Sequence, residues 1–486
     1  MNLIIPSFHL SSIGPWLTLT VTAILILVLD ALSPKGQKGC FSWVALVGLA
    51  VAAIQTIGLW GQNGTDFARM VYLDNYSCFF YMIFILGAAL TVLISRQYLE
   101  DYGKNMGEYY ALMLFATVGM MLMAAGAHLI MIFLGLEVMS IAVYVLAGLF
   151  REDLRSNEAA LKYLILGSFS SAFLLFGMAM LYGASGGTLF LSDLPSRLGA
   201  DPAMQPLVLL GMGLLIVGFG FKVASAPFHM WTPDVYEGAP TSVTAFMAVA
   251  VKAAAFAAFA RVFFLAFPAM KVDWTMLLWV LAVATMTIGN VAAISQTNIK
   301  RMLAYSSIAH AGYLLVALVA ANQLGAVSLL YYLLAYTLMN LGAFGVVILV
   351  GRKKDSYLNI YDYSGLGAQH PVLAASMALF MFALAGIPPT AGFVGKFYIF
   401  SAAIQAGYIW LAIIGVMNSL VSVFYYLRIT VLMYMKPAEA DLGLVTFSPA
   451  QTAVVAVTAA GVLAIGIFPG CLYNLAMNAV KIFPGL

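Results

Sequence analysis

Long apolar runs separated by short polar stretches dominate this chain. The runs are continuous and do not alternate between apolar and polar positions, which excludes a membrane-spanning sheet and predicts helices. About 20 apolar residues cross the hydrocarbon core of a bilayer as a helix. We therefore predict about fourteen transmembrane helices, bounded by Gly, Pro, Asn or charged residues. They fall at residues 13–33, 41–60, 76–97, 107–125, 129–150, 158–184, 204–224, 241–267, 274–295, 300–321, 325–351, 371–402, 406–434 and 450–475.

The composition supports an all-α polytopic membrane protein. Of the 486 residues, 63% are hydrophobic and 8% are charged, whereas a soluble domain has about 25% charged residues. We expect a single membrane domain over residues 1–486, made of N-terminal helices (1–106), two five-helix repeats (107–267 and 274–434) and a C-terminal helix (435–486). The net charge of +3 is spread along the chain, which gives no support for nucleic-acid binding.

The loop cations predict the orientation, because Lys and Arg accumulate in cytoplasmic loops. With the N-terminus outside, 14 loop cations fall on the cytoplasmic side and 4 on the outer side. The cytoplasmic set is Lys35, Lys38, Arg96, Lys104, Arg151, Arg155, Lys162, Lys300, Arg301, Arg352, Lys353, Lys354, Arg428 and Lys436, and the outer set is Arg69, Arg197, Lys271 and Lys481. This asymmetry favours fourteen helices with both termini outside.

Five charged residues lie within apolar segments. Arg261 is close enough to a helix end for its side chain to snorkel to the interface. Glu137, in LIMIFLGLEVMSIAVYVL, is the carboxylate in the middle of an apolar span, and we expect it to pair with one of Lys222, Lys252 and Lys396. A charge at the membrane centre costs at least about 2.5–3.5 kcal/mol. Pairing and burial oppose each other in setting proton affinity, so these groups are candidates for loading and releasing protons. The alternative is that they only fasten helices together.

Two of the lysines lie beside helix-breaking stretches. Lys222 precedes the prolines of GFGFKVASAPFHMWTPDVYEGAP, and Lys396 follows the Pro-Pro pair of LAGIPPTAGFVGKFY. Non-helical backbone at membrane depth survives where it lines a cavity or is buried in protein. We therefore predict hydrated sites at interrupted helices 7 and 12. Their matching places predict two inverted repeats, helices 4–8 and 9–13.

Histidines and cysteines limit the chemistry further. His310, in NIKRMLAYSSIAHAGYLLVAL, either bridges the two halves as a relay or is an ordinary core histidine. His229 lies by the first break and suits a loop or hinge contact. Cys40, Cys78 and Cys471 have no metal-ligand spacing, so we expect neither a metal site nor a redox centre in this chain.

The motifs KVASAPFHMWTPDVYEGAP, SQTNIKRMLAYSSIAHAGYLLVAL and LAGIPPTAGFVGKFY resemble, in order and spacing, the signatures of one family. It comprises the antiporter-like membrane subunits of respiratory complex I, the proton-pumping NADH:quinone oxidoreductase, and more distantly subunits of Mrp-type Na+/H+ antiporters. The motif WTPDVYEGAP, followed by Lys252 in AVAVKAAAF, is most similar to the branch called subunit N, or subunit 2 in mitochondria and chloroplasts.

The resemblance implies a proton relay. Glu137 and Lys222 would form the input pair, Lys252 the connecting site with His310 assisting, and Lys396 the exit site. The second half has no carboxylate equivalent to Glu137, which favours one path that enters through one half and leaves through the other.

The same resemblance implies a setting. The chain would be a proton-translocating subunit of the enzyme in a bacterial inner membrane, with its termini on the periplasmic side. Its partners would be sister antiporter-like subunits, small membrane subunits and lipids. Quinone, FMN and iron–sulfur clusters would belong to partner subunits. Two alternatives stay open: a Na+/H+ antiporter subunit and a structural scaffold of a membrane complex.

Overall fold

The computed structural model of the chain describes residues 9–33, 38–104, 106–199, 201–351, 355–438 and 448–483. In chain order the helices are α1 (Gly14–Leu32), η1 (Lys38–Cys40), α2 (Phe41–Leu59), α3 (Asn75–Asp101), α4 (Gly107–Ala125), α5 (Leu129–Ala147), α6 (Leu154–Ala184), α7 (Leu194–Arg197), η2 (Pro202–Met204), α8 (Gln205–Val223), α9 (Trp231–Gly238), α10 (Thr241–Phe246), η3 (Met247–Val251), α11 (Lys252–Ala266), η4 (Pro268–Met270), α12 (Lys271–Ile294), α13 (Ile299–Ala320), α14 (Gln323–Gly351), η5 (Ile360–Tyr363), α15 (Leu366–Gln369), α16 (Pro371–Ala385), α17 (Ala391–Gln405), α18 (Ile409–Met435), α19 (Pro449–Ile467) and α20 (Pro469–Val480).

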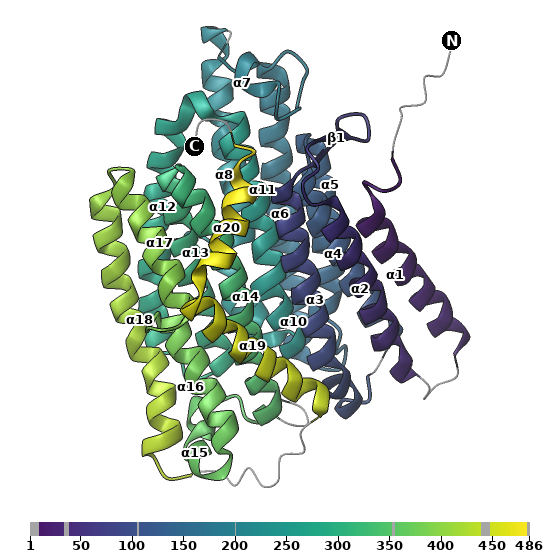
Figure 1. Ribbon diagram of the computed structural model, residues 1–486, viewed down its shortest axis with the longest axis vertical. Helices are drawn as coiled ribbons and strands as arrows, with labels where there is room; N and C mark the ends of the chain where they lie inside the picture. The colour runs from purple at the N-terminus through teal and green to yellow at the C-terminus, as the bar shows by residue number, and fades with distance from the viewer. Residues whose placement is uncertain are drawn as a thin grey trace.

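The long helices run side by side in one bundle (Figure 1). Thirteen helical stretches of the described chain are long and apolar enough to cross a membrane. The predicted helix over 371–402 is present as the shorter pair α16 and α17. Among the predicted cytoplasmic cations, Lys35, Arg352, Lys353 and Lys354 lie outside the described residues.

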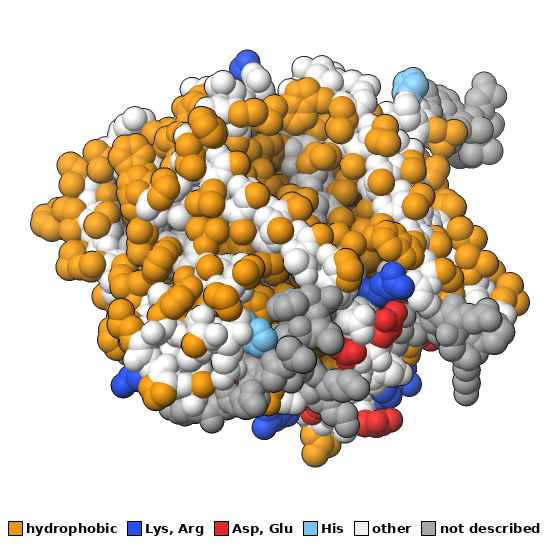
Figure 2. Space-filling model, turned by 60° about the horizontal axis from the view of Figure 1, so that its bottom comes forward, with side chains coloured by type: hydrophobic (Ala, Val, Ile, Leu, Met, Phe, Trp, Pro, Cys, Tyr) orange, Lys and Arg blue, Asp and Glu red, His pale blue; other side chains and the backbone are white. Residues whose placement is uncertain are grey.

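Burial sorts the bundle into centre and periphery. The continuous span formed by α10, η3 and α11 is wholly buried, and α13 and α14 are nearly so, whereas at most a third of the residues of α1, α18 or α19 are buried. Hydrophobic side chains cover the flanks in Figure 2, and most of the charged side chains in view gather toward the end that faces forward and down. Apolar flanks with a charged end are the surface expected of a bundle surrounded by lipid.

Both predicted breaks are confirmed. Helix α8 ends at Val223, because Ala224 turns into the left-handed region, and the chain resumes as α9 at Trp231. Helix α16 ends at Ala385, Gly386 forms a left-handed cap, and Pro388 and Pro389 follow before α17 begins. A left-handed cap followed by proline is a strong helix stop. The inverted-repeat relation between the two halves stays a prediction.

Two local features differ from the prediction. The predicted helix over 450–475 is divided at Phe468 into α19 and α20, because Pro469 cannot donate a backbone hydrogen bond to the preceding turn. The stretch between α2 and α3, for which no regular structure was predicted, holds an antiparallel hairpin of β1 (Gly64–Asp66) and β2 (Val71–Leu73). Helix α1 begins, and α20 ends, toward the upper end of the bundle in Figure 1.

The snorkelling prediction for Arg261 was wrong. The side chain is 0% exposed, and its guanidinium binds Asp74 through Nη1 at 2.8 Å and Nη2 at 3.0 Å. It also donates to Ser77 Oγ at 2.9 Å and to the Ala124 carbonyl at 2.7 Å. The surrounding helices α3 and α4 supply acceptors for this buried charge, so it does not have to reach the interface.

Candidate functional site

The first buried amine, Lys222, lies in the last turn of α8, immediately before the first break. It is 3% exposed. Its Nζ donates to Ser140 Oγ at 2.8 Å and to the Tyr144 hydroxyl at 3.2 Å, both on α5. Two neutral hydroxyl groups therefore satisfy the amine in this structure.

Glu137 lies one turn before Ser140 on the same face of α5. Glu137 makes no direct ion pair in this structure, since no lysine Nζ or arginine nitrogen of the described residues lies within 4.0 Å of its carboxylate. Its buried Oε1 has no hydrogen-bond partner, although the carboxylate still interacts electrostatically with Lys222. The hydrogen bonds of the Lys222 amine go instead to Ser140 and Tyr144 of the same helix α5.

The second amine, Lys252, is the first residue of α11 and follows the π-helical turn η3 directly. Its Nζ donates to the Ser307 carbonyl at 2.6 Å and also bonds the Ser307 hydroxyl. Ser307 belongs to α13, so this contact joins the two halves of the bundle.

His310 lies one turn after Ser307 and is completely buried. Its Nδ1 is 2.6 Å from the Tyr332 hydroxyl and its Nε2 is 3.0 Å from the Tyr426 hydroxyl. Tyr426 also bonds the hydroxyl of Ser306. The imidazole therefore sits in a closed set of hydroxyl groups, which can donate or accept according to its tautomer.

The third amine, Lys396, lies in the second turn of α17 and reaches back to the end of α16. Its Nζ donates to the Leu384 and Ala385 carbonyls at 2.9 Å each and to Ser419 Oγ at 2.9 Å. These are the last carbonyls before the second break, where the helix dipole favours a cation. The break thus places free carbonyl groups around the amine.

Beside the second break lies a cavity of about 460 Å³ that is open to the surface of the bundle, where Phe393 and Phe397 are exposed. Lys396, Ser401 and Ser419 contribute to its wall, together with apolar side chains that include Phe393 and Phe397. Lys252 and Lys396 both interact electrostatically with His310. The structure therefore brings Lys252, His310 and Lys396 into one polar region, with Lys222 and Glu137 in another.

Sequence reasoning missed the polar groups that extend this region. Asn290 on α12 donates to the Tyr313 hydroxyl at 3.2 Å and accepts from the Tyr425 hydroxyl at 2.9 Å. The Tyr313 ring lies 4.9 Å from Lys396 Nζ. The available signal was an amide within an otherwise apolar span, which is costly unless it is bonded.

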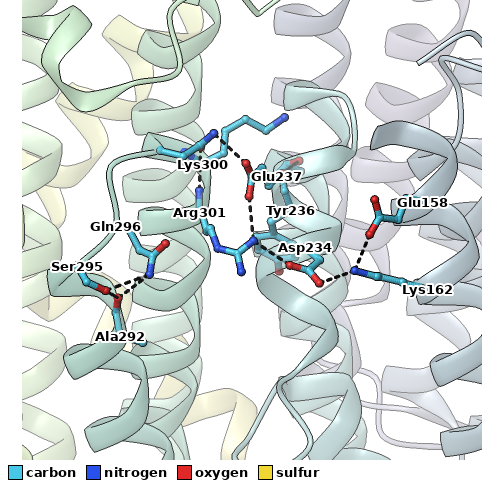
Figure 3. A network of polar contacts seen from close by, with 12 residues as sticks. Glu158, Lys162, Asp234, Tyr236, Glu237, Ala292, Ser295, Gln296, Lys300 and Arg301 are labelled. Atoms are coloured by element: carbon cyan, nitrogen blue, oxygen red, sulfur yellow. Dashed lines mark hydrogen bonds and ion pairs between the residues drawn. The ribbon is translucent and has the colours of Figure 1, made fainter. Parts of the chain in front are cut away.

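A second missed feature is an ion-pair network at the end of α9 (Figure 3). Lys162 binds Glu158 and Asp234 at 2.7 Å each, and Arg301 binds Asp234 at 2.8 Å and Glu237 at 2.9 Å. Partial burial raises the pKa of Asp234, but hydrogen bonds from the two cations outweigh it and the net direction is downward. The network ties α6, α9 and α13 together. Its signal was the two acids of WTPDVYEGAP.

His229 lies in the connection between α8 and α9, as predicted for a loop or hinge contact. Its buried Nδ1 has no hydrogen-bond partner. Among the described residues, no group of three or more His, Cys, Asp or Glu side chains could hold a metal ion.

Known proteins resemble this chain in both sequence and fold. The family described as NADH:quinone oxidoreductase/Mrp antiporter, transmembrane, matches residues 125–422. A protein from Trichlorobacter lovleyi, named NADH-quinone oxidoreductase subunit N, is 51% identical over 478 residues, which cover 98% of each chain.

Solved structures agree with these sequence matches. A chain of respiratory complex I from Thermus thermophilus is 36% identical and superposes with a TM-score of 0.82, over 95% of this chain and 99% of that one. A chain of the Mrp complex from Dietzia sp. DQ12-45-1b has a TM-score of 0.83 at 22% identity, over 97% of both chains, and shows the shared fold alone. The chain is therefore an integral membrane protein of the NADH:quinone oxidoreductase/Mrp antiporter family, and within that family it belongs to the branch of subunit N of NADH-quinone oxidoreductase.

Proposed function

We propose that the chain carries protons across the membrane through Glu137, Lys222, Lys252, His310 and Lys396, driven by quinone reduction in partner subunits. The observation that carries this proposal is the kind of partner that the three amines have. Each is buried and bonded to hydroxyl or carbonyl groups, and none has a carboxylate of the described residues within 4.0 Å.

Hydroxyl partners suit a group that changes its protonation state. A carboxylate partner would hold a lysine in its charged form, whereas a serine or tyrosine hydroxyl accepts from an ammonium group and donates to a neutral amine. Lys222 has two such hydroxyl partners, and Lys252 and Lys396 have one each. Each amine therefore keeps a hydroxyl group within hydrogen-bond distance in either protonation state.

The Glu137 carboxylate, which makes no direct ion pair, would change the electrostatic energy of Lys222 if the two groups approached each other. At an effective dielectric constant of about 20, closing the gap between two unit charges from about 8 to about 4 Å changes their interaction by about 2 kcal/mol. Moving one charge against the membrane potential costs about 2.3 kcal/mol per 100 mV. An approach of Glu137 to Lys222 would therefore be comparable to the work of moving one proton.

The path that we propose enters beside Glu137 and Lys222, crosses between the halves at Lys252 and His310, and leaves at Lys396. The contact of Lys252 with Ser307 supports the crossing. The hydroxyl groups around His310 and the cavity beside Lys396 support the second half of the path.

The setting follows from the relatives. We propose a bacterial inner membrane, with both termini on the periplasmic side as the loop cations indicate. The partners would be sister antiporter-like subunits, small membrane subunits and lipids. Quinone, FMN and iron–sulfur clusters would be held by those partners and none by this chain, which agrees with its isolated cysteines.

The test replaces Lys252 with Met in the assembled complex and measures NADH-driven proton uptake by inverted membrane vesicles. Lys252→Met should abolish most proton uptake, and Lys436→Met, at an exposed lysine, should not. Full proton uptake by Lys252→Met and by Lys222→Met would contradict the relay and favour the scaffold. Proton movement that requires Na+ in proteoliposomes would favour the Na+/H+ antiporter.

A further inference from the structure

Asp74 and Arg261 form a polar anchor that holds the C-terminal half of α11. Neither residue belongs to the proposed relay. Asp74 precedes α3 and caps it, accepting from the Ser77 backbone N–H at 2.7 Å. The same carboxylate takes both terminal nitrogens of Arg261, and Arg261 Nε donates to the Ala124 carbonyl. One guanidinium therefore joins α11 to α3 and α4.

Tyr76 adds a second attachment to the same face of α11. Its hydroxyl donates to the Ala257 carbonyl at 2.9 Å, and its ring lies 4.6 Å from the Arg261 guanidinium carbon. Ala257 and Arg261 are one turn apart. The residues at the start of α3 thus bond two successive turns of α11.

The first turns of α11 have few bulky side chains to fix the height of the helix along the bundle axis. Its first nine residues, Lys252–Ala260, are mostly alanine. Small side chains form shallow ridges, so their packing sets the axial position weakly. Ring contacts, of Phe259 with Phe219 at 5.2 Å and of Phe263 with Trp274 at 5.7 Å, limit rotation further along the helix. Arg261 adds directional bonds that specify one register of this helix.

On the other side of Lys252 the helix is interrupted. The π-helical turn η3 ends at Val251, directly before the lysine. A π turn breaks the regular i to i+4 ladder and can absorb a shift of one residue. The position of Lys252 is consequently set from the α11 side, where Tyr76 bonds Ala257 and where Arg261 lies nine residues or about 14 Å along the helix.

We propose that Asp74 and Arg261 are positioning residues that fix the register of α11 and so place Lys252 Nζ against Ser307. This inference rests on the relay function proposed above for Lys252. Without the anchor, α11 could rotate at the π turn by about 100° per residue. Such a rotation would separate Lys252 from both acceptors that Ser307 offers. The pair would then matter for proton transfer although it touches no group of the relay.

The test uses a double variant, Asp74→Asn with Arg261→Met, in the assembled complex, since asparagine keeps the N-cap that Asp74 gives to α3. Removing both charges of a buried pair together leaves no uncompensated charge, whereas removing one member does. We expect normal amounts of assembled complex and proton-coupled turnover at least about threefold lower than wild type. Adding Ser307→Ala to the double variant should cause no further loss, because the same contact is already broken.

The following results would overturn the inference about the anchor, or would show that the proposed relay itself is wrong. Wild-type turnover of the double variant would overturn the inference, as would a loss that multiplies with that of Ser307→Ala. If the double variant does not assemble, Arg261→Lys keeps the charge, loses the forked geometry, and is judged by the same two criteria. Full proton uptake by Lys252→Met would instead defeat the relay itself, whatever the anchor variants show.

Discussion

Replacing Ser307 with Ala removes one of the two acceptors around Lys252 without changing the backbone. The Ser307 carbonyl stays at 2.6 Å from Nζ, and only the hydroxyl contact is lost. A hydrogen bond to a charged group contributes about 1.5–3 kcal/mol, and about 1.4 kcal/mol changes a population tenfold. Because the carbonyl remains, we take the lower end and expect proton transfer through Lys252 to slow by about tenfold.

The assay measures NADH-driven proton uptake and NADH oxidation in the same inverted membrane vesicles, with the amount of assembled complex as the reference. Ser328→Ala is the matched control, since Ser328 is equally buried but its hydroxyl bonds only the Gly325 carbonyl of its own helix. The reasoning is refuted if Ser307→Ala and Ser328→Ala pump protons at the same rate.

Three further predictions concern the second break, the imidazole and the ion-pair network. Gly392→Ala should reduce the assembled complex, because its Cβ would lie 1.8 Å from the Ala383 carbonyl oxygen, and overpacking costs about 1–3 kcal/mol; Gly213→Ala, with open space, is the control, and equal yields would contradict this. Tyr426→Phe should lower proton uptake severalfold, since it removes a hydrogen-bond partner of the imidazole; unchanged uptake would exclude that hydroxyl from the path. Asp234→Asn should destabilise the complex by at most about 1 kcal/mol at pH 7. The pKa of Asp234 is lowered, so its contribution is present above the ordinary carboxyl pKa of about 3.9 and is lost as pH falls through the folded value. Thermal melting should therefore separate variant from wild type at pH 7 and not in acid, and a difference that persists in acid would contradict the ion-pair explanation.

The helices and their interruptions were predictable because their causes are local. An apolar run of about 20 residues has few alternatives to a transmembrane helix, and a proline stops a helix whatever surrounds it. The same rule explains why the last apolar run, predicted as one helix over 450–475, is divided at Pro469.

The partners of buried charges were not predictable in the same way. Arg261 was expected at the interface, yet its acceptors come from Asp74, which is 187 residues away in the sequence. Glu137 was expected to pair with one of the three buried lysines, and the hydrogen bonds of Lys222 go to Ser140 and Tyr144 instead. Which acceptor a buried donor finds depends on the rotation of neighbouring helices. When a helix is apolar on all sides, its sequence does not show which side faces which neighbour.

The central claim is that buried amines gain and lose protons during turnover, and infrared difference spectroscopy tests it most directly. The assembled complex, labelled with 15N-lysine, would be compared at rest and during NADH oxidation, for wild type and for Lys222→Met, Lys252→Met and Lys396→Met. We predict label-sensitive N–H deformation bands that change with turnover in wild type and diminish in each variant. Bands that stay constant throughout turnover, or that are the same in all four proteins, would contradict the account.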